Sequence, residues 1–432
     1  MGSYAGIYVN GREVFTYRNE VFPEVMYLFS DDEFLHLRGQ EALPYASNWH
    51  SGVLDEESIE DIEVHVYQVN ASVLKDRLNV LGFGEPLVRS VVEALLREEI
   101  RRKTDLLEHF EGNAIQGEIQ RELEDLRRLD YDSWKASVGE HVASKKESPH
   151  PDWRTKGPLG LFEYADERVL LRVIVDAIAG DEPVVLDVSD LVEGGYMDGA
   201  EDTEDEYESS WDLGSGPPIV ITEGSYDVRV LRSAIEVLKP HLSSYIRFLD
   251  YDIGNEGGAS AAVRMLKSFA AAGVSNRIVA IFDNDSAAYE AVMSLRGTKL
   301  PPHYAVIHYP DLELANAYPT LGPQGNTVMN VNRLAGSIEL YLGKDVLTSS
   351  DGELTPVQWR GYMSKIGSYQ GEVTNKAALQ SAFRGKVKAV MADPAKVGMQ
   401  DWSGLALILD ELIDTLSSLS STGSTAGGVA TD

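Results

Sequence analysis

The sequence contains no cysteine among its 432 residues. Disulfides, thiol nucleophiles, iron–sulfur clusters and zinc sites built with cysteine are therefore excluded, and metal ligands must come from the nine histidines and the many carboxylates. No run approaches the ~18 to 20 apolar residues of a membrane span, and the first residues lack the charge and apolar core of a signal peptide. We expect a cytoplasmic protein with no membrane partner.

Positive charge is also scarce, since 38 Lys and Arg face 69 Asp and Glu and the net charge is −31 at pH 7. This balance argues against a protein that coats nucleic acid through a globally basic surface. The charge is unevenly distributed, because residues 173–228 contain 16 acids and no Lys or Arg. Within them, the acidic, Gly-rich stretch 193–218 predicts a solvated linker, and the alternative is an arm that mimics nucleic acid.

The N-terminal part has the pattern of an α+β domain. Apolar and polar residues alternate around Asn10-Gly11, which is a strong hairpin signal. Apolar residues then recur at helical spacing over 85–110, and a more polar helix is predicted at 114–129. A connector rich in Gly, Pro, Ser and charge follows at 144–158, and 168–191 predicts a helix and a strand.

From residue 218 short strands alternate with helices of 10–15 residues. This alternation predicts a Rossmann-like α/β domain, a doubly wound parallel sheet whose functional groups lie at the carboxyl ends of its strands. We therefore divide the chain into an α+β N-terminal domain (1–150), a connector with helix, strand and acidic linker (151–217), an α/β catalytic domain (218–310), a C-terminal extension (311–416) and a disordered tail (417–432).

Three successive strands of the α/β region end in carboxylates: Glu223 with Asp227, Asp250 with Asp252, and Asp283 with Asp285. Adjacent parallel strands lie ~4.8 Å apart, so acids at their common edge repel one another unless a cation lies between them. All-oxygen ligands suit Mg²⁺ or Mn²⁺. Taken singly, each acid has a simpler explanation, as a helix N-terminal charge for Glu223 or a helix N-cap for Asp285.

These residues resemble a known family. The strand ending in Glu223-Gly224, the helix with Asp227, and the later strand ending in Asp283-x-Asp285 resemble the Toprim domain of topoisomerases, primases and OLD-type nucleases, over about 218–310. The phrases YPTLGPQG, AGSIELYLG and LTPVQWRGY, with the start MGSYA, resemble bacterial proteins that join a HEPN/Toprim-associated N-terminal domain to a Toprim effector. Those proteins are thought to act in anti-phage defence.

The resemblance implies a Mg²⁺- or Mn²⁺-dependent nuclease that hydrolyses phosphodiester bonds of DNA or RNA. It assigns metal binding and catalysis to Glu223, Asp227, Asp283 and Asp285. The absence of cysteine and the chain length argue against a primase or a topoisomerase. The rival hypothesis is a non-catalytic Toprim-fold protein that regulates, or that binds a partner or a nucleic acid.

Three further acids have two interpretations each. Asp250 and Asp252 depart from the usual Toprim pattern, so they are either extra metal ligands or charged loop residues. Glu339 would complete a second metal position, as a late acid does in OLD-type nucleases, or it is a surface acid before an amphipathic turn.

The N-terminal domain offers a weaker catalytic motif. Arg102 and His109 fall within the loose Arg-x4–6-His spacing of HEPN ribonucleases, but this spacing is undemanding and amphipathicity already explains the helix. We interpret the domain as a sensor, an oligomerisation module or a binding site for a defence partner protein. A homodimer is expected because two-fold dimers are the commonest soluble assemblies.

A basic and aromatic segment follows near the C-terminus. Its cations are Lys365, Lys376, Arg384, Lys386 and Lys388, and its aromatics are Trp359, Tyr362, Tyr369 and Phe383. Such a mixture can hold phosphates and stack bases, or it is a helix with ordinary solvated cations.

Limited proteolysis tests the proposed division of the chain. We expect the first cuts between about 194 and 215 and after 416, because these stretches lack core-forming residues. Mass spectrometry of the fragments locates the cuts. Full protection of 194–215 would contradict the linker.

Overall fold

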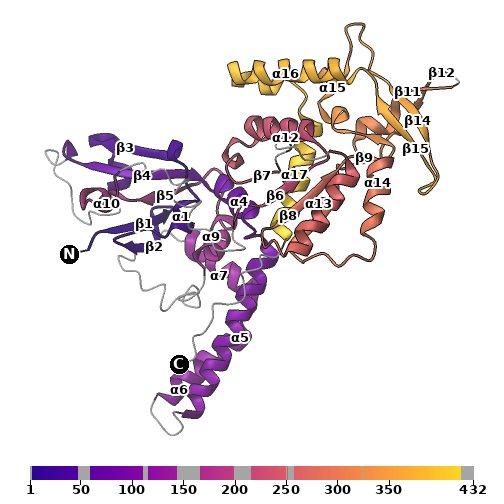
Figure 1. The fold of residues 1–432 in the computed structure, drawn as a ribbon. Helices are drawn as coiled ribbons and strands as arrows, with labels where there is room; N and C mark the ends of the chain where they lie inside the picture. Colours follow the sequence, from indigo (N-terminus) through magenta and orange to yellow (C-terminus); the bar gives the residue numbers. More distant parts are fainter. Residues whose placement is uncertain are drawn as a thin grey trace. The chain divides into compact units, whose positions relative to one another are not determined.

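The computed structural model describes residues 2–46, 59–109, 115–143, 166–198, 216–249, 251, 257–323 and 325–419. The chain divides into two compact units, one over 1–212 and one over 213–423 (Figure 1). No helix in the described ranges is long and apolar enough to cross a membrane.

The first unit is built on a five-stranded antiparallel sheet with the order β2-β1-β5-β4-β3. Its strands are β1 (Tyr4–Val9), β2 (Arg12–Arg18), β3 (Phe34–Arg38), β4 (Glu63–Asn70) and β5 (Pro183–Asp187). The predicted hairpin at Asn10-Gly11 is confirmed. Both turn residues have positive φ, +53° and +69°, as the tight turn that suits twisted strands requires.

Strand β5 lies between β1 and β4 in this sheet. Its residues Val184 and Leu186 are fully buried, so the strand completes the interior of the first unit. The sequence pattern predicted the strand but placed it in a connector, because local patterning does not reveal which distant strands will be its neighbours. The first unit of the structure therefore extends well past residue 150.

Helices complete the first unit: α1 (Pro23–Met26), α2 (Leu43–Ala46), α4 (Ala71–Val80), α5 (Glu85–His109), α6 (Gln116–Arg128), α7 (Tyr131–Ala143), α9 (Glu167–Asp176) and α10 (Ser189–Glu193). The predicted helices at 85–110 and 114–129 are confirmed as α5 and α6. Helix α5 packs against α6, α7 and α9. Its buried residues Val88, Val92 and Leu96 recur every four residues, so helices of the same unit cover the first half of its apolar stripe.

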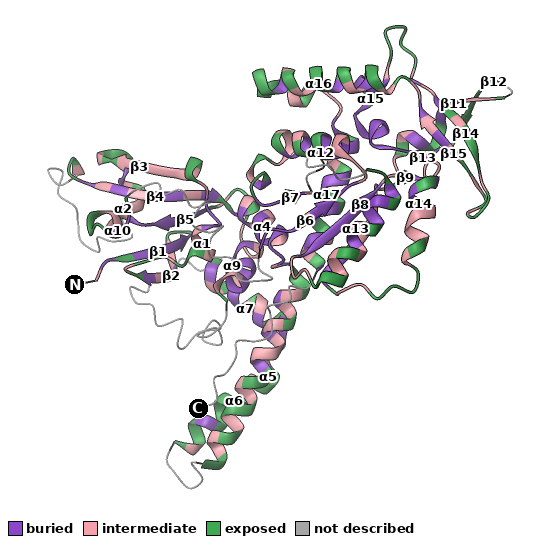
Figure 2. Ribbon diagram, in the orientation of Figure 1, coloured by how far each residue is buried: buried purple, intermediate pink, exposed green. Residues whose placement is uncertain are grey.

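The second unit contains the predicted parallel sheet, with the order β10-β8-β6-β7. Its strands are β6 (Ile219–Ile221), β7 (Arg247–Phe248), β8 (Ile278–Phe282) and β10 (Tyr304–His308). All five residues of β8 are buried (Figure 2). This is expected of a parallel strand that is covered on both faces.

Four helices pack around this sheet: α12 (Ser225–Leu238), α13 (Ala259–Ala272), α14 (Ser286–Val292) and α17 (Ser403–Ser418). Helices α13 and α14 cover one face with a shared apolar core that includes Leu266, Phe282 and Ala288. Helix α17 comes from the far end of the chain, yet it contacts both β8 and α12. The C-terminal segment is thus part of the α/β unit, and α17 ends two residues inside the stretch that the sequence assigned to the tail.

The remaining strands include a second four-stranded sheet with the order β12-β11-β14-β15. They are β11 (Tyr318–Gly322), β12 (Gly325–Met329), β14 (Val357–Met363) and β15 (Ser368–Val373), with helices α15 (Lys344–Leu347) and α16 (Lys376–Ala392). A two-stranded ladder pairs β13 (Ala335–Gly336) with β9 (Asn284–Asp285). This ladder joins the extension directly to the segment that follows β8.

The β9–β13 ladder is tight at Gly336. A Cβ atom at this position would lie 2.6 Å from the Asn284 backbone oxygen. We therefore expect Gly336→Ala to lower the free energy of unfolding by about 1–3 kcal/mol, the usual cost of overpacking. Chemical denaturation measures the change. Gly361→Ala is the matched control, because nothing lies within 4 Å of its added Cβ; equal stability of the two variants would contradict the close approach.

Candidate functional site

Glu223 and Asp283 meet at the carboxyl edge of the parallel sheet. Glu223 lies two residues after β6, and Asp283 directly follows β8. Because β6 and β8 are neighbours in the sheet, Glu223 Oε1 accepts a hydrogen bond from the Asp283 backbone N–H at 3.0 Å. The structure thus brings together two of the acids that the sequence placed at strand ends.

Asp227 lies in the first turn of α12 and is 8% exposed. Its Oδ1 accepts a hydrogen bond from the Tyr309 hydroxyl at 3.0 Å, and that tyrosine is also buried. No sequence motif pointed to Tyr309. The strand-end rule applied to the acids would have found it, because Tyr309 directly follows β10.

Asp285 has the capping role that the simpler explanation gave it. Its Oδ1 accepts a hydrogen bond from the Ala288 N–H at 2.8 Å, at the N-cap of α14. Its Oδ2 accepts one from Gln370 Nε2 at 2.7 Å. Gln370 comes from β15, and no sequence signal identified it. If Asp285 bound a cation through Oδ2, the cation would therefore replace the hydrogen bond from Gln370.

Glu339 is 3% exposed, so it is not a surface acid. It lies in a short 3-10 helix, Ile338–Tyr341, that follows β13. Its carboxylate accepts hydrogen bonds from Ser337 Oγ at 2.8 Å and Gln380 Nε2 at 3.2 Å, and Lys376 Nζ lies 3.4 Å from Oε2. Lys376, which the sequence analysis grouped with the basic segment, is therefore a counter-ion of this acid.

These acids lie near enough to influence one another's pKa values, although among the described residues no three of them bring ligand atoms within 4.8 Å of one another. Burial raises the pKa of Glu223 to about 7, with further contributions from the charges of Asp285 and Asp227. Burial likewise raises the pKa of Asp227 to about 6, and the charge of Glu339 adds to it. The pKa of Asp283 is raised well above its usual range by burial and then by the charge of Glu223. Each charge is therefore costly in the absence of a cation.

One oxygen of the cluster lacks a partner. Asp283 Oδ1 is buried and has no hydrogen-bond partner among the described residues. A buried polar atom of this kind is costly unless something binds it. An oxygen-liganded divalent cation would satisfy it and would also reduce the repulsion, and carboxylate oxygens are the ligand type that Mg²⁺ and Mn²⁺ prefer.

Asp250 and Asp252 lie outside the described residues. Tyr251, which stands between them in the sequence, is described, and its hydroxyl donates a hydrogen bond to the Thr222 carbonyl. Burial raises the pKa of Tyr251 to about 12. The structure therefore places Tyr251 beside the residue that precedes Glu223.

The basic and aromatic segment separates into buried and exposed parts. Lys386 is buried, and its Nζ donates a hydrogen bond to Asp345 Oδ1 at 2.9 Å. Phe383 is buried in α16. Tyr362 and Tyr369 are 59% and 57% exposed, and their ring centroids are 5.2 Å apart. Tyr369 directly precedes Gln370, the residue that contacts Asp285. The exposed aromatic pair is thus connected to the acid cluster through one residue.

Two other features do not add groups to the cluster. Arg102 lies on α5 and donates hydrogen bonds to Glu99 at 2.7 and 2.8 Å, as an exposed helical ion pair does.

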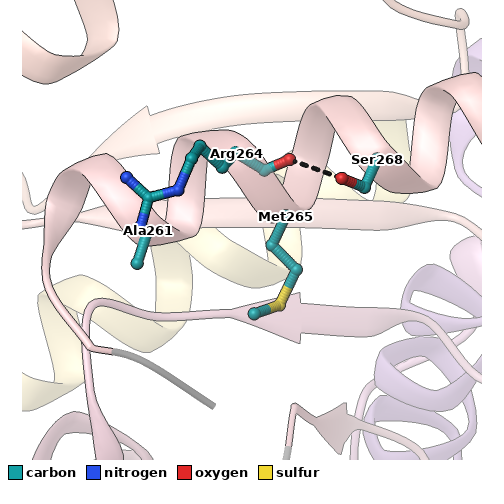
Figure 3. Close-up of a pocket in the computed structure, with 4 residues that line it drawn as sticks. All are labelled: Ala261, Arg264, Met265 and Ser268. Atoms are coloured by element: carbon teal, nitrogen blue, oxygen red, sulfur yellow. Dashed lines mark hydrogen bonds between the residues drawn. The ribbon is translucent and has the colours of Figure 1, made fainter.

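A pocket in the second unit is lined by Ala261, Arg264, Met265 and Ser268, all from α13 (Figure 3). The Ser268 hydroxyl donates to the Arg264 carbonyl at 3.0 Å within the helix. None of these lining residues is a carboxylate.

Comparison with known proteins identifies the first unit. Residues 1–210 match the family model described as HEPN/Toprim N-terminal domain 1. The match ends two residues before the boundary between the compact units. The first unit is therefore a HEPN/Toprim-associated N-terminal domain, which confirms the resemblance of this part of the chain. No curated protein and no solved structure matches the chain.

The raised pKa values predict how stability depends on pH in the absence of divalent cations. The pKa of Glu223 is about 7 in the folded chain, against an ordinary value of 4.5. Protonation therefore stabilises the fold below pH 4.5, and this stabilisation is lost as the pH rises through about 7. Between pH 4.5 and 8, we expect the free energy of unfolding of wild type to fall by roughly 1–3 kcal/mol more than that of Glu223→Gln.

The measurement is urea denaturation in the presence of a chelator. Glu236→Gln, at an exposed position of α12, is the matched control and should follow wild type. Identical pH profiles for wild type and Glu223→Gln would contradict the raised pKa.

Proposed function

We propose that this chain, whose first unit is a HEPN/Toprim-associated N-terminal domain, carries a Toprim nuclease in its second unit. The enzyme would hydrolyse phosphodiester bonds of DNA or RNA with Mg²⁺ or Mn²⁺. The observation that supports it is the group formed by Glu223, Asp227 and Asp283 at the edge of a parallel sheet, where their surroundings raise all three pKa values and where Asp283 Oδ1 has no hydrogen-bond partner among the described residues. Such a cluster is stable with its acids ionised only if a cation balances the charge.

Glu223, Asp227 and Asp283 would hold the metal, and the buried acids Asp285 and Glu339 would join them. When bound, a divalent ion neutralises phosphate charge and lowers the pKa of a bound water. The carboxylates are ligands in this proposal and not nucleophiles. Their supports are visible in the structure, since Tyr309 orients Asp227 and Gln370 orients Asp285.

Tyr362 and Tyr369 support nucleic acid as the substrate. Exposed aromatic side chains stack on bases without sequence preference. This pair is tied to the site, because the Tyr369 carbonyl accepts a hydrogen bond from Ser286 Oγ at 2.9 Å, next to Asp285. A polyanion would meet these residues locally, although the net charge of −31 repels it at long range.

The repulsion favours an enzyme that is restrained until it is activated. We propose that a phage signal or a defence partner protein releases the activity, and that the first unit receives it. Assembly as a homodimer in the bacterial cytoplasm completes this hypothesis. Rapid cleavage of bulk DNA and RNA by the purified chain alone would contradict the restraint without contradicting the metal site.

Cation binding and cleavage should both depend on the acid cluster. We expect Glu223→Gln and Asp283→Asn to weaken Mn²⁺ binding at least about 100-fold. Mutation of a residue that only contacts a metal ligand already lowers metal affinity about 10–100-fold, and these two residues would be ligands themselves. Calorimetry measures binding, and gel assays with DNA and RNA measure cleavage. Both variants should also abolish cleavage or the toxicity of overexpression.

Glu236→Gln is the control for these variants and should behave as wild type. Retained cleavage in Glu223→Gln would refute the proposed site. Cation binding without cleavage or toxicity under any condition would instead favour the non-catalytic alternative.

A further inference from the structure

A second group of metal-ligand side chains lies in the first unit, on strands β3 and β4. His36, Glu63 and His65 each offer one ligand atom, and these atoms all lie within 4.8 Å of one another. Among the described residues, this is the one group of three or more His, Asp or Glu residues that meets that limit.

The strand register explains why these side chains gather. His36 pairs directly with His65, and Arg38 pairs with Glu63, across an antiparallel ladder. Side chains two residues apart on a strand share a face, so all four project from the same side of the sheet. Leu35, Leu37, Val64 and Val66 project from the opposite side and belong to the core.

The geometry is close to what a transition metal requires. The two imidazole rings are stacked, with centroids 4.4 Å apart and planes at 20°. Glu63 Oε1 hydrogen-bonds His36 Nε2 and lies 3.8 Å from His65 Nε2. Two ligands about 2.0–2.1 Å from a tetrahedral zinc lie roughly 3.4 Å apart, so the ligand atoms would have to shift by about 1 Å.

We propose that His36, Glu63 and His65 bind a divalent transition metal, with zinc as the best-fitting ion. Two imidazole nitrogens and one carboxylate leave a fourth coordination position open. Imidazole ligands select zinc and related ions over Mg²⁺, which prefers oxygen. The His36 and Glu63 side chains are 42% and 36% exposed, so the ion can enter from solvent. This proposal does not depend on the proposed nuclease function.

The metal would stabilise the pairing of the edge strand β3 with β4. Among the described strands, β3 is at the end of the strand order and pairs with β4 alone. An ion held by His36 on β3 and by Glu63 and His65 on β4 would crosslink the two strands. Zinc should therefore raise the midpoint of thermal unfolding of the full chain.

Two features limit the affinity of this site for zinc. Arg38 Nη2 lies 2.8 Å from Glu63 Oε1, so the ion must displace this 67% exposed side chain. His65 Nδ1 is buried without a hydrogen-bond partner among the described residues, whereas histidine ligands of strong sites donate from the other ring nitrogen. We therefore expect weaker binding than at a structural zinc site. Arg38→Gln should tighten it by up to about 5-fold, the worth of an exposed ion pair.

The test is calorimetric titration of zinc into the full, chelator-treated chain in excess Mg²⁺, which fills oxygen-rich sites. We expect one zinc per chain. His36→Gln and Glu63→Gln should weaken binding at least about 100-fold, because each removes a direct ligand. Both side chains are partly exposed, so the fold should survive, and circular dichroism checks this.

Two control variants separate this site from other zinc-binding groups. His109→Gln removes an exposed histidine of α5, and Glu223→Gln alters the acid cluster; both should bind zinc as wild type does. Absence of zinc binding to wild type, or unchanged binding in His36→Gln and Glu63→Gln, would overturn the proposal and leave only an exposed ion pair. Loss of binding in Glu223→Gln alone would assign the zinc to the acid cluster instead.

Discussion

The adjacency of β6 and β8 is the constraint on which the candidate site depends. Parallel strands end at a common edge, so the residues after them are brought together whatever their charge. Glu223 and Asp283 are consequently held in contact, because the Asp283 backbone N–H donates a hydrogen bond to the Glu223 carboxylate. Burial prevents water from screening their charges, and the raised pKa values of Glu223, Asp227 and Asp283 express the resulting cost.

The C-terminal extension supplies most of the groups that surround this cluster. Glu339 follows β13, Gln370 lies in β15 and Lys376 begins α16. The β9–β13 ladder holds the extension against the segment that contains Asp285. Residues from about 335 to 376 are thus part of the site, although the sequence analysis placed the catalytic domain at 218–310.

The two candidate metal sites differ in chemistry as well as in position. The acid cluster of the second unit offers oxygen ligands in a buried setting, which suits hard cations such as Mg²⁺. The β3–β4 group of the first unit offers two imidazoles and a carboxylate at a partly exposed sheet surface, which suits zinc. The absence of cysteine leaves histidine as the one nitrogen or sulfur ligand of the usual zinc-binding kinds.

Much of this architecture is determined by local sequence patterns. The turn at Asn10-Gly11, the long helix α5, and the strands that carry Glu223 and Asp283 all follow from periodicity and turn chemistry, because these depend on near neighbours in the chain. The strand-end rule also predicted that the acids would meet. It requires only that the strands be parallel and adjacent.

Tertiary structure alone decided which distant segments became neighbours. Strand β5 completes the N-terminal sheet, α17 contacts β8, and Gln370 reaches Asp285. It also decided that Glu339 is buried and that His36 faces His65, since a cross-strand pair depends on the register of two segments separated by a loop. Such pairings are fixed by the packing of whole elements, which the pattern within any one element does not specify.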